Sequence, residues 1–192
     1  QKGSKADGTL GYMTEEQYEQ LANSGFVEQA GHRRFIGYAS NTSNHSIEIN
    51  YADRVQQELT FCVPTHGEAP EKANEIATTD LALKALGVEP KVGAEVPLEF
   101  ELRGKTYHYD MVLSGWWEAS NGSVSVAIVS EQFIKENPDV VQNTYAVDHE
   151  MFGVTFSDVV LKDKANVQQQ LNDFVYSIGG NPEDMGADNF IL

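Results

Sequence analysis

The histidines are the first groups to consider for chemistry, because an imidazole can act as a general base or bind a metal near neutral pH. The chain has five of them, and none forms the H-x-H or H-E-x-x-H spacing that brings two imidazoles to one metal ion. Only one cysteine accompanies them. We therefore predict no metal-binding residue and no metal ion.

One histidine has acidic neighbours on both sides. Asp148 and Glu150 flank His149, and a carboxylate beside an imidazole can orient it as a base or help it to bind a cation. Residues 144–156 are expected to be extended, and on a strand the two carboxylates would share one face while the imidazole points to the other. A solvated strand end is the favoured interpretation, and a hydrolase that uses these groups is the weaker alternative.

The candidate nucleophiles lack the sequence context of catalysis. Ser114 precedes Gly115 without the G-x-S-x-G frame of a serine nucleophile. Cys62 lies in an alternating apolar run and is expected to be a buried hydrophobic residue. The chain also has neither G-x-x-x-x-G-K-[ST] nor G-x-G-x-x-G, the two common phosphate-binding patterns. We therefore predict a protein that is not an enzyme, with no catalytic residue and no cofactor.

Two adjacent tryptophans are the residues with the clearest potential for a partner contact. Trp116 and Trp117 follow the bend at Gly115. One indole is expected to fill the core, and the other could lie in an interface, where an aromatic ring with a polar N–H is well suited. A packing role for both is the preferred alternative.

The charge limits the classes of partner. The chain of 192 residues has a formal net charge of −16, which argues against nucleic acid and anionic membrane surfaces, because both attract Lys and Arg. Cations and cationic peptides are compatible with this charge. The sequence has no apolar run long enough for a membrane helix and no signal-peptide pattern, and its start at Gln1 suggests a piece of a longer or processed protein.

The elements that would position these groups begin with local signals. Residues 1–12 have no period and are expected to be a loose lead-in. Thr14 and Gln17 form a capping box that predicts a helix. Residues 35–39 and 46–51 predict a hairpin whose polar face is in solvent, and residues 59–63 predict another extended run.

The central stretch, residues 74–119, organises the rest. It predicts a short strand, a helix that is capped by Thr79 or Asp80, and two alternating strands, Glu95–Leu102 and Thr106–Leu113. Short strands with glycines at the bends are typical of a small barrel-like β unit. After it, residues 123–129 predict a strand, Ser130 caps a helix that ends before Pro138, and residues 163–178 have the apolar spacing of a surface helix.

Together these motifs resemble the extracytoplasmic core domain of FtsX/MacB-type ABC transporter permeases, especially the large permeases of Gram-positive envelopes. The resemblance rests on P-T-H-G-E-A-P-E-K-A-N-E-I, on L-G followed by V-G, and on a strand that ends in L-S-G. The M-T-E-E-Q-Y-E-Q-L helix is also similar to the segment after the first membrane helix of these permeases. The matching residues are Gly67, Pro70, Asn74, Glu75, Ile76, Leu86, Gly87, Val92, Gly93, Leu113, Ser114 and Gly115.

This resemblance implies an α+β fold in two parts. The two ends of the chain, residues 1–64 and 131–192, would form an α/β porter-like part, and residues 65–130 would form an inserted β-rich, barrel-like lobe. The domain would lie outside the membrane between the first two transmembrane helices. A separate cytoplasmic ATPase subunit would act through those helices, and a second permease copy or subunit, a peptide or an envelope protein would be further partners.

The function that the resemblance implies is mechanotransmission without catalysis. ATP-driven conformational change would be coupled to the export of, or signalling about, an envelope substrate such as a peptide, an antibiotic, a lipid or a lipoprotein, at the extracellular face of a cell membrane, with a Gram-positive-type envelope favoured. The alternative is a free-standing secreted or surface binding module with an acidic face for cations or cationic peptides.

Overall fold

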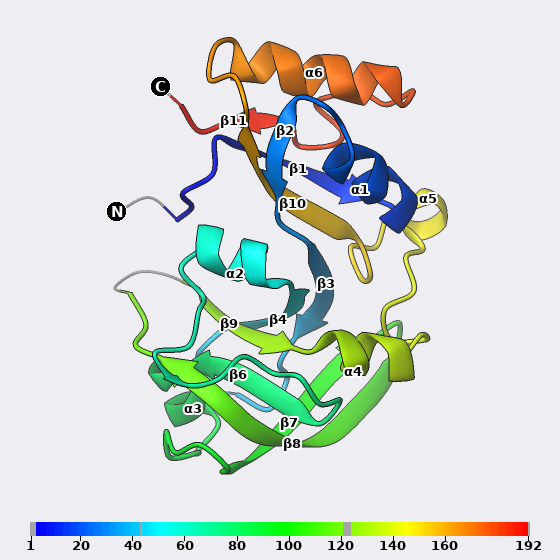
Figure 1. Cartoon of the computed structure of the whole chain (residues 1–192). Coiled ribbons are helices and arrows are strands. Elements are labelled where there is room, and N and C mark those ends of the chain that lie inside the picture. Colours follow the sequence, from blue (N-terminus) through cyan, green and yellow to red (C-terminus); the bar gives the residue numbers. More distant parts are fainter. Residues whose placement is uncertain (1–2, 43, 121–123, 192) are drawn as a thin grey trace.

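The computed structural model describes residues 3–42, 44–120 and 124–191, which form a mixed α/β structure around one long sheet (Figure 1). In chain order the elements are β1 (Gly8–Met13), α1 (Glu15–Ala22), β2 (Val27–Ala30), β3 (Arg33–Tyr38), β4 (Ile47–Ala52), α2 (Arg54–Leu59), β5 (His66–Gly67), β6 (Glu75–Thr79), α3 (Asp80–Ala85), β7 (Glu95–Leu102), β8 (Lys105–Trp117), β9 (Ser125–Val129), α4 (Glu131–Glu136), α5 (Tyr145–Asp148), β10 (Thr155–Leu161), α6 (Val167–Ser177) and β11 (Asp188–Asn189).

The sheet runs through two regions of the molecule. Its strand order in the described residues is β11-β1-β10-β3-β4-β9-β6-β8-β5, with β2 paired to β10 and β7 paired to β8. Figure 1 shows β1, β2, β10 and β11 with α1 and α6 at the top, and β4, β6, β7, β8 and β9 with α3 and α4 below. Strand β3 joins the regions, since it pairs with β10 at Arg33 and Arg34 and with β4 along its length.

Each region has its own buried core. The upper cluster includes Leu10 and Leu171, which bring β1 and α6 together. The lower and larger cluster includes Ile49, Phe100 and Phe133 from β4, β7 and α4. These side chains are almost fully buried, and burial of each such side chain contributes about 1.5–3 kcal/mol of transfer free energy.

Three helix starts confirm the capping residues that the sequence predicts. The Thr14 hydroxyl accepts from Gln17 N, and the Gln17 side chain accepts from Thr14 N, which completes the capping box of α1. Thr79, and not Asp80, caps α3. Ser130 caps α4, whose last residue, Glu136, precedes Asn137-Pro138 as predicted.

The β7–β8 hairpin also follows its local sequence. The two strands pair from Glu95 with Val112 to Leu102 with Lys105. The side chains that were predicted to face inward from β7 are all buried: Val96, Leu98, Phe100 and Leu102. Positive φ angles at Arg103 and Gly104 close the two-residue turn, which is the backbone geometry that matches the twist of two paired strands.

The prediction of a barrel-like lobe is wrong, because the sheet is not closed. Strand β8 changes partners along its length: it pairs with β7 up to Val112, and with β6 and β5 only near its end. The far edge of β7 meets the segment after β3 at one isolated bridge, between Ala39 and Phe100. A closed barrel needs a continuous ladder on both sides of every strand, and one bridge does not supply it.

Several segments differ from their sequence-based predictions. Residues 8–13 form strand β1 and not a loose lead-in, because this segment pairs with β10 and β11. The run 59–63 is not extended, since α2 ends at Leu59. Residues 145–148 form the short helix α5, which ends at His149 in the left-handed conformation. In α6 the predicted apolar face is buried, but the helix starts at Val167 and not at Asp163.

Candidate functional site

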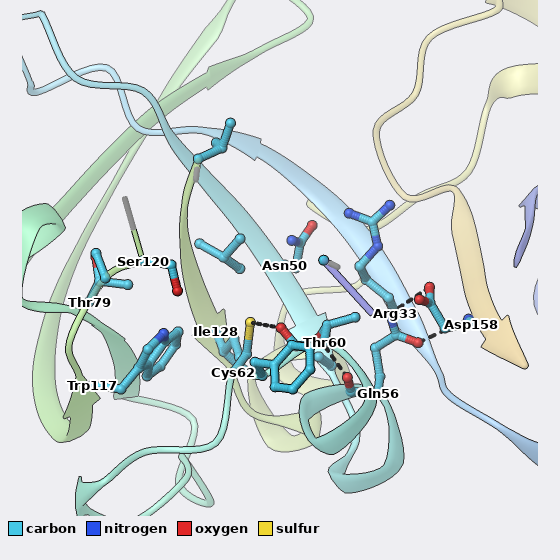
Figure 2. Close-up of a pocket in the computed structure, with 16 residues that line it drawn as sticks. Arg33, Asn50, Gln56, Thr60, Cys62, Thr79, Trp117, Ser120, Ile128 and Asp158 are labelled. Carbon is cyan, nitrogen blue, oxygen red and sulfur yellow. Dashed lines mark hydrogen bonds between the residues drawn. The ribbon is translucent and has the colours of Figure 1, made fainter. Parts of the chain in front are cut away.

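A pocket of about 630 Å³ lies on the face of the sheet that points away from the lower core (Figure 2). Successive side chains of a strand point to opposite faces of the sheet, so the strands that fill the lower core also present side chains to this other face. Ile49 of β4 points into the lower core, whereas Asn50 and Ala52 line the pocket. Asn50 is in parallel register with Ile128 of β9, which also lines it. Helix α2 and residues 60–62 lie over this face and supply further lining residues.

Distant parts of the chain contribute to the lining. The pocket is lined by Gly3, Arg33, Asn50, Ala52, Gln56, Thr60, Phe61, Cys62, Thr79, Trp117, Ala119, Ser120, Val124, Val126, Ile128 and Asp158. Figure 2 shows Asn50 between a side with Trp117 and Thr79 and a side with Arg33 and Asp158. The pocket therefore joins elements of the lower region to β10 of the upper region.

Asn50 is the unusual polar residue of the pocket. Its side chain is only 1% exposed, and within the described part of the chain its Oδ1 atom has no hydrogen-bond partner. The sequence predicts a polar face in solvent for this strand, and that prediction is wrong at Asn50. A buried amide oxygen without a partner costs stability, so its presence here calls for an explanation.

The charged groups at the other side of the pocket each have partners of their own. Asp158 Oδ1 accepts from Gln56 Nε2 at 3.1 Å, and Asp158 Oδ2 accepts from Ser4 Oγ at 2.5 Å. Arg33 Nη1 lies 3.2 Å from Glu48 Oε1, and its guanidinium lies over the ring of Phe156. This side of the pocket is therefore polar, and its positive charge is paired.

Cys62 does not have the properties of a catalytic nucleophile. Burial raises the pKa of its thiol, and its Sγ contacts the carbonyl oxygen of Thr60 at 3.4 Å. A thiol reacts as its thiolate, so a raised pKa makes it less reactive. No histidine is among the described lining residues. Cys62 therefore lacks the surroundings that activate a thiol.

The two tryptophans have different surroundings. Trp117 is 7% exposed and forms part of the pocket wall. Trp116 is half-buried, packs against the lower core and stacks on His66 with 3.9 Å between ring centroids. His66 Nε2 in turn lies 2.9 Å from Glu118 Oε1. Trp117 is thus a core residue, and the indole of Trp116 has the imidazole of His66 stacked on it.

The group around His149 is not an acid–base arrangement. A hydrogen bond from the Glu150 backbone N–H, together with one from the Thr144 hydroxyl, lowers the pKa of Asp148. The His149 ring instead meets the ring of Tyr145 edge-on. Across residues 3–42, 44–120 and 124–191, no three His, Cys, Asp or Glu side chains are grouped so that they could hold a metal ion.

A second polar cluster ties α1 to β3. Glu15 Oε2 lies 2.6 Å from His32 Nε2, and Glu15 Oε1 lies 3.2 Å from Arg34 Nη1. Thr155 of β10 donates to the same carboxylate at 3.3 Å. The His32 ring stacks on Tyr18 with 4.1 Å between centroids. Because every polar group here has a close partner, we assign this cluster a structural role.

The sequence did not reveal the pocket, because its residues are separated along the chain and have no common motif. The available signals were weak: Asn50 at a polar position of an alternating strand, and adjacent tryptophans at Trp116 and Trp117. Neither indicates a cavity until the covering segments are in place.

Comparison with known proteins identifies the architecture. No family model matches the chain, and no curated protein sequence matches it. Among solved structures, the periplasmic region of MacB from Actinobacillus actinomycetemcomitans has a TM-score of 0.57 at 9% identity, over 97% of this chain and 90% of its own. The fold is that of the extracytoplasmic domain of a MacB-type ABC transporter permease.

Two further structures share this MacB-type fold. The extracellular domain of the noncanonical ABC-type transporter YknZ from Gram-positive bacteria has a TM-score of 0.55 at 12% identity, over 94% of this chain and 96% of its own. A domain of a permease protein from Porphyromonas gingivalis has a TM-score of 0.51 at 8% identity, over 96% and 79%. The MacB-type resemblance that the sequence suggested is thus confirmed for the fold.

No helix in the described part of the chain is both long and apolar enough to cross a bilayer.

Proposed function

We propose that this chain is the extracytoplasmic domain of an ABC transporter permease and that it transmits conformational change without catalysing a reaction. The observation that carries this proposal is the MacB-type fold, which is shared over 94% or more of the chain with three domains whose names assign them to MacB, to YknZ and to a permease. We propose a location at the outer face of a cell membrane on the same ground.

The positions of the two ends of the chain support this proposal. Gly8 of β1 pairs with Asn189 of β11 in an antiparallel ladder, and Phe190 N donates to Asp7 O at 2.8 Å. Figure 1 shows both ends emerging on the same side of the upper region. A domain that is inserted between two membrane helices needs its ends close together, and this pairing meets that requirement.

We propose that residues 1–64 and 131–192 act as the membrane-proximal porter-like part and residues 65–130 as a lobe that reports its movement. Strand β4 joins this part to the lobe, because it pairs in parallel with β9 along its length. A cytoplasmic ATPase would act through membrane segments, and a second permease copy, a peptide or an envelope protein would meet the outer lobe. Trp116 is the proposed contact residue, because it is less buried than Trp117.

The location can be tested in the full-length protein with cysteine labelling. Val147 is 86% exposed, so Val147→Cys gives one accessible thiol in a background where Cys62 and any cysteine outside this chain are replaced by Ala. We expect a membrane-impermeant maleimide to label this variant in intact cells, and the cysteine-free background to remain unlabelled. Labelling only after lysis would contradict an outward-facing domain. Recovery of the labelled protein in the culture medium would favour the free-standing binding module.

The transporter assignment has a separate test. The full-length protein, solubilised from membranes, is expected to co-purify with an ATPase that carries a phosphate-binding loop. We expect this complex to hydrolyse ATP, and the same preparation from cells without the permease to lack that ATPase. Purification of the permease without any ATPase, under conditions that preserve other transporters, would count against the proposal.

A further inference from the structure

We propose that the pocket beneath α2 binds a small, uncharged and mainly apolar molecule whose N–H or O–H group donates a hydrogen bond to Asn50. This inference goes beyond the proposed function and does not depend on it, because it rests on the pocket alone. Its volume of about 630 Å³ lies within the range of small-molecule sites, about 300–1,000 Å³.

The walls of the pocket favour an apolar ligand. Trp117, Val126 and Ile128 supply aromatic and branched aliphatic surface from β8 and β9. Two further lining residues, Phe61 and Val124, are 37% and 61% exposed although both are large and apolar. A ligand that lies between them would remove this surface from water, which is favourable in proportion to the apolar area buried.

Asn50 supplies the polar anchor. Three buried side-chain oxygens in the described residues have no hydrogen-bond partner, and of these Asn50 Oδ1 belongs to a residue that lines the pocket. A donor on the ligand would satisfy this oxygen on a residue that is 1% exposed, and an unmade hydrogen bond of a buried group is expensive. The unpaired amide is thus explained as one half of a ligand contact.

The charges exclude an anionic ligand. The two described lining residues with charged side chains are Arg33 and Asp158. Arg33 is paired with Glu48, and Asp158, which accepts from Ser4 and Gln56, is itself negative, so neither offers a free positive charge to an anion. The net charge of −16 repels anions further. An anion would lose its hydration without gaining a counter-charge.

Three related probes test each part of this proposal with the 192-residue chain. N-phenylnaphthylamine is neutral and has one N–H donor, its N-methyl derivative lacks the donor, and anilinonaphthalene sulfonate adds an anionic group to the same rings. We expect saturable binding of the neutral amine, followed by probe fluorescence and calorimetry, and binding that is at least about tenfold weaker for the N-methyl derivative and for the sulfonate. Equal affinities for all three, or no binding of the amine, would overturn the proposal.

The variant Asn50→Leu tests the anchor. It keeps a similar side-chain volume and removes the acceptor, so we expect about tenfold weaker binding of the amine, the effect of one hydrogen bond, and unchanged binding of the N-methyl derivative. Asn41→Leu is the matched control, because Asn41 also has a buried oxygen without a described partner but does not line the pocket. An equal loss of affinity for the amine in both variants would show that Asn50 is not the anchor.

Cys62 reports where the probe binds and needs no substitution. It is the single cysteine of the chain and lines the pocket. We expect saturating N-phenylnaphthylamine to slow alkylation of Cys62 by N-ethylmaleimide severalfold, and alkylated protein that retains its circular dichroism spectrum to lose probe binding. Alkylation at an unchanged rate in the presence of bound probe would place the probe elsewhere and overturn the assignment, even if Asn50→Leu failed to fold.

Discussion

Glu15 Oε2 lies 2.6 Å from His32 Nε2, and this contact joins the first turn of α1 to the residue that precedes β3. The same carboxylate contacts Arg34, which lies on β3 itself. The His32 backbone N–H donates to Asp53 Oδ1 at 3.0 Å, next to α2. One acidic side chain therefore helps to hold α1 against the strand that joins the two regions of the fold.

This pair predicts a dependence of stability on pH. Burial raises the pKa of Glu15, but the hydrogen bond with His32 and the charges of His32 and Arg34 outweigh it, so the pKa is lowered from 4.5. The stabilisation is therefore present above the unfolded-state pKa and is lost as the pH falls through the lower folded-state pKa. We expect urea unfolding between pH 7 and pH 3 to show that the free energy of unfolding falls less steeply with acidification in Glu15→Gln than in wild type.

Glu16→Gln is the matched control for this pH series, because Glu16 is the exposed neighbour in the same helical turn. It is expected to follow the wild-type pH profile. If Glu15→Gln and Glu16→Gln gave the same profile, the contact with His32 would not stabilise the fold.

Asn50→Leu is predicted to stabilise the protein in the absence of ligand. The substitution removes a buried oxygen without a described partner, and this should raise the free energy of unfolding by about 1 kcal/mol. Asn41→Leu should not do so, because Asn41 Nδ2 donates to Pro97 O at 2.9 Å and this hydrogen bond would be lost. Urea unfolding of both variants measures the difference, and a loss of stability in Asn50→Leu would mean that the amide has a partner in solution.

The two tryptophans should differ in their contribution to stability. Trp117→Ala removes a side chain that is 7% exposed and should cost about 3–5 kcal/mol. Trp116→Ala removes a half-buried ring and its stack on His66, and should cost about 1–2 kcal/mol, less than a fully buried aromatic ring. Thermal and urea unfolding provide the test. If Trp116→Ala lost as much stability as Trp117→Ala, there would be little reason to propose Trp116 as a partner contact.

Gly115 and Gly87 are expected to be required for different reasons, Gly115 because a side chain would clash and Gly87 because of its positive φ angle. A Cβ at Gly115 would lie 2.5 Å from Glu68 O and 2.8 Å from Pro64 Cβ, so Gly115→Ala should separate β5 from β8 and cost about 2–3 kcal/mol. Gly87 has φ +74° and open space around it, so Gly87→Ala should cost only the left-handed penalty of about 1 kcal/mol. Equal unfolding free energies for the two variants would contradict this ranking.

Local chemistry in the sequence determined the features that short segments can stabilise by themselves. The caps at Thr14 and Ser130 were predictable because a hydroxyl and the backbone N–H three residues later are brought together by the helix itself. The β7–β8 hairpin was predictable because alternation and a two-residue turn set its register. The glycine and apolar pattern of residues 67–115 likewise carried the resemblance to MacB-type domains.

Tertiary structure alone decided what depends on distant partners. Residues 8–13 became a strand because β10 and β11 provide hydrogen-bonding edges for them, and the barrel stayed open because β8 divides its length between β7, β6 and β5. The pocket has the same origin. Strand alternation indicated that Asn50 faces away from Ile49, but whether that face meets water or a covered pocket depends on where α2 and residues 60–62 pack. Whether the polar face of a strand is also buried is a property of the assembled chain, and the alternation of that strand does not encode it.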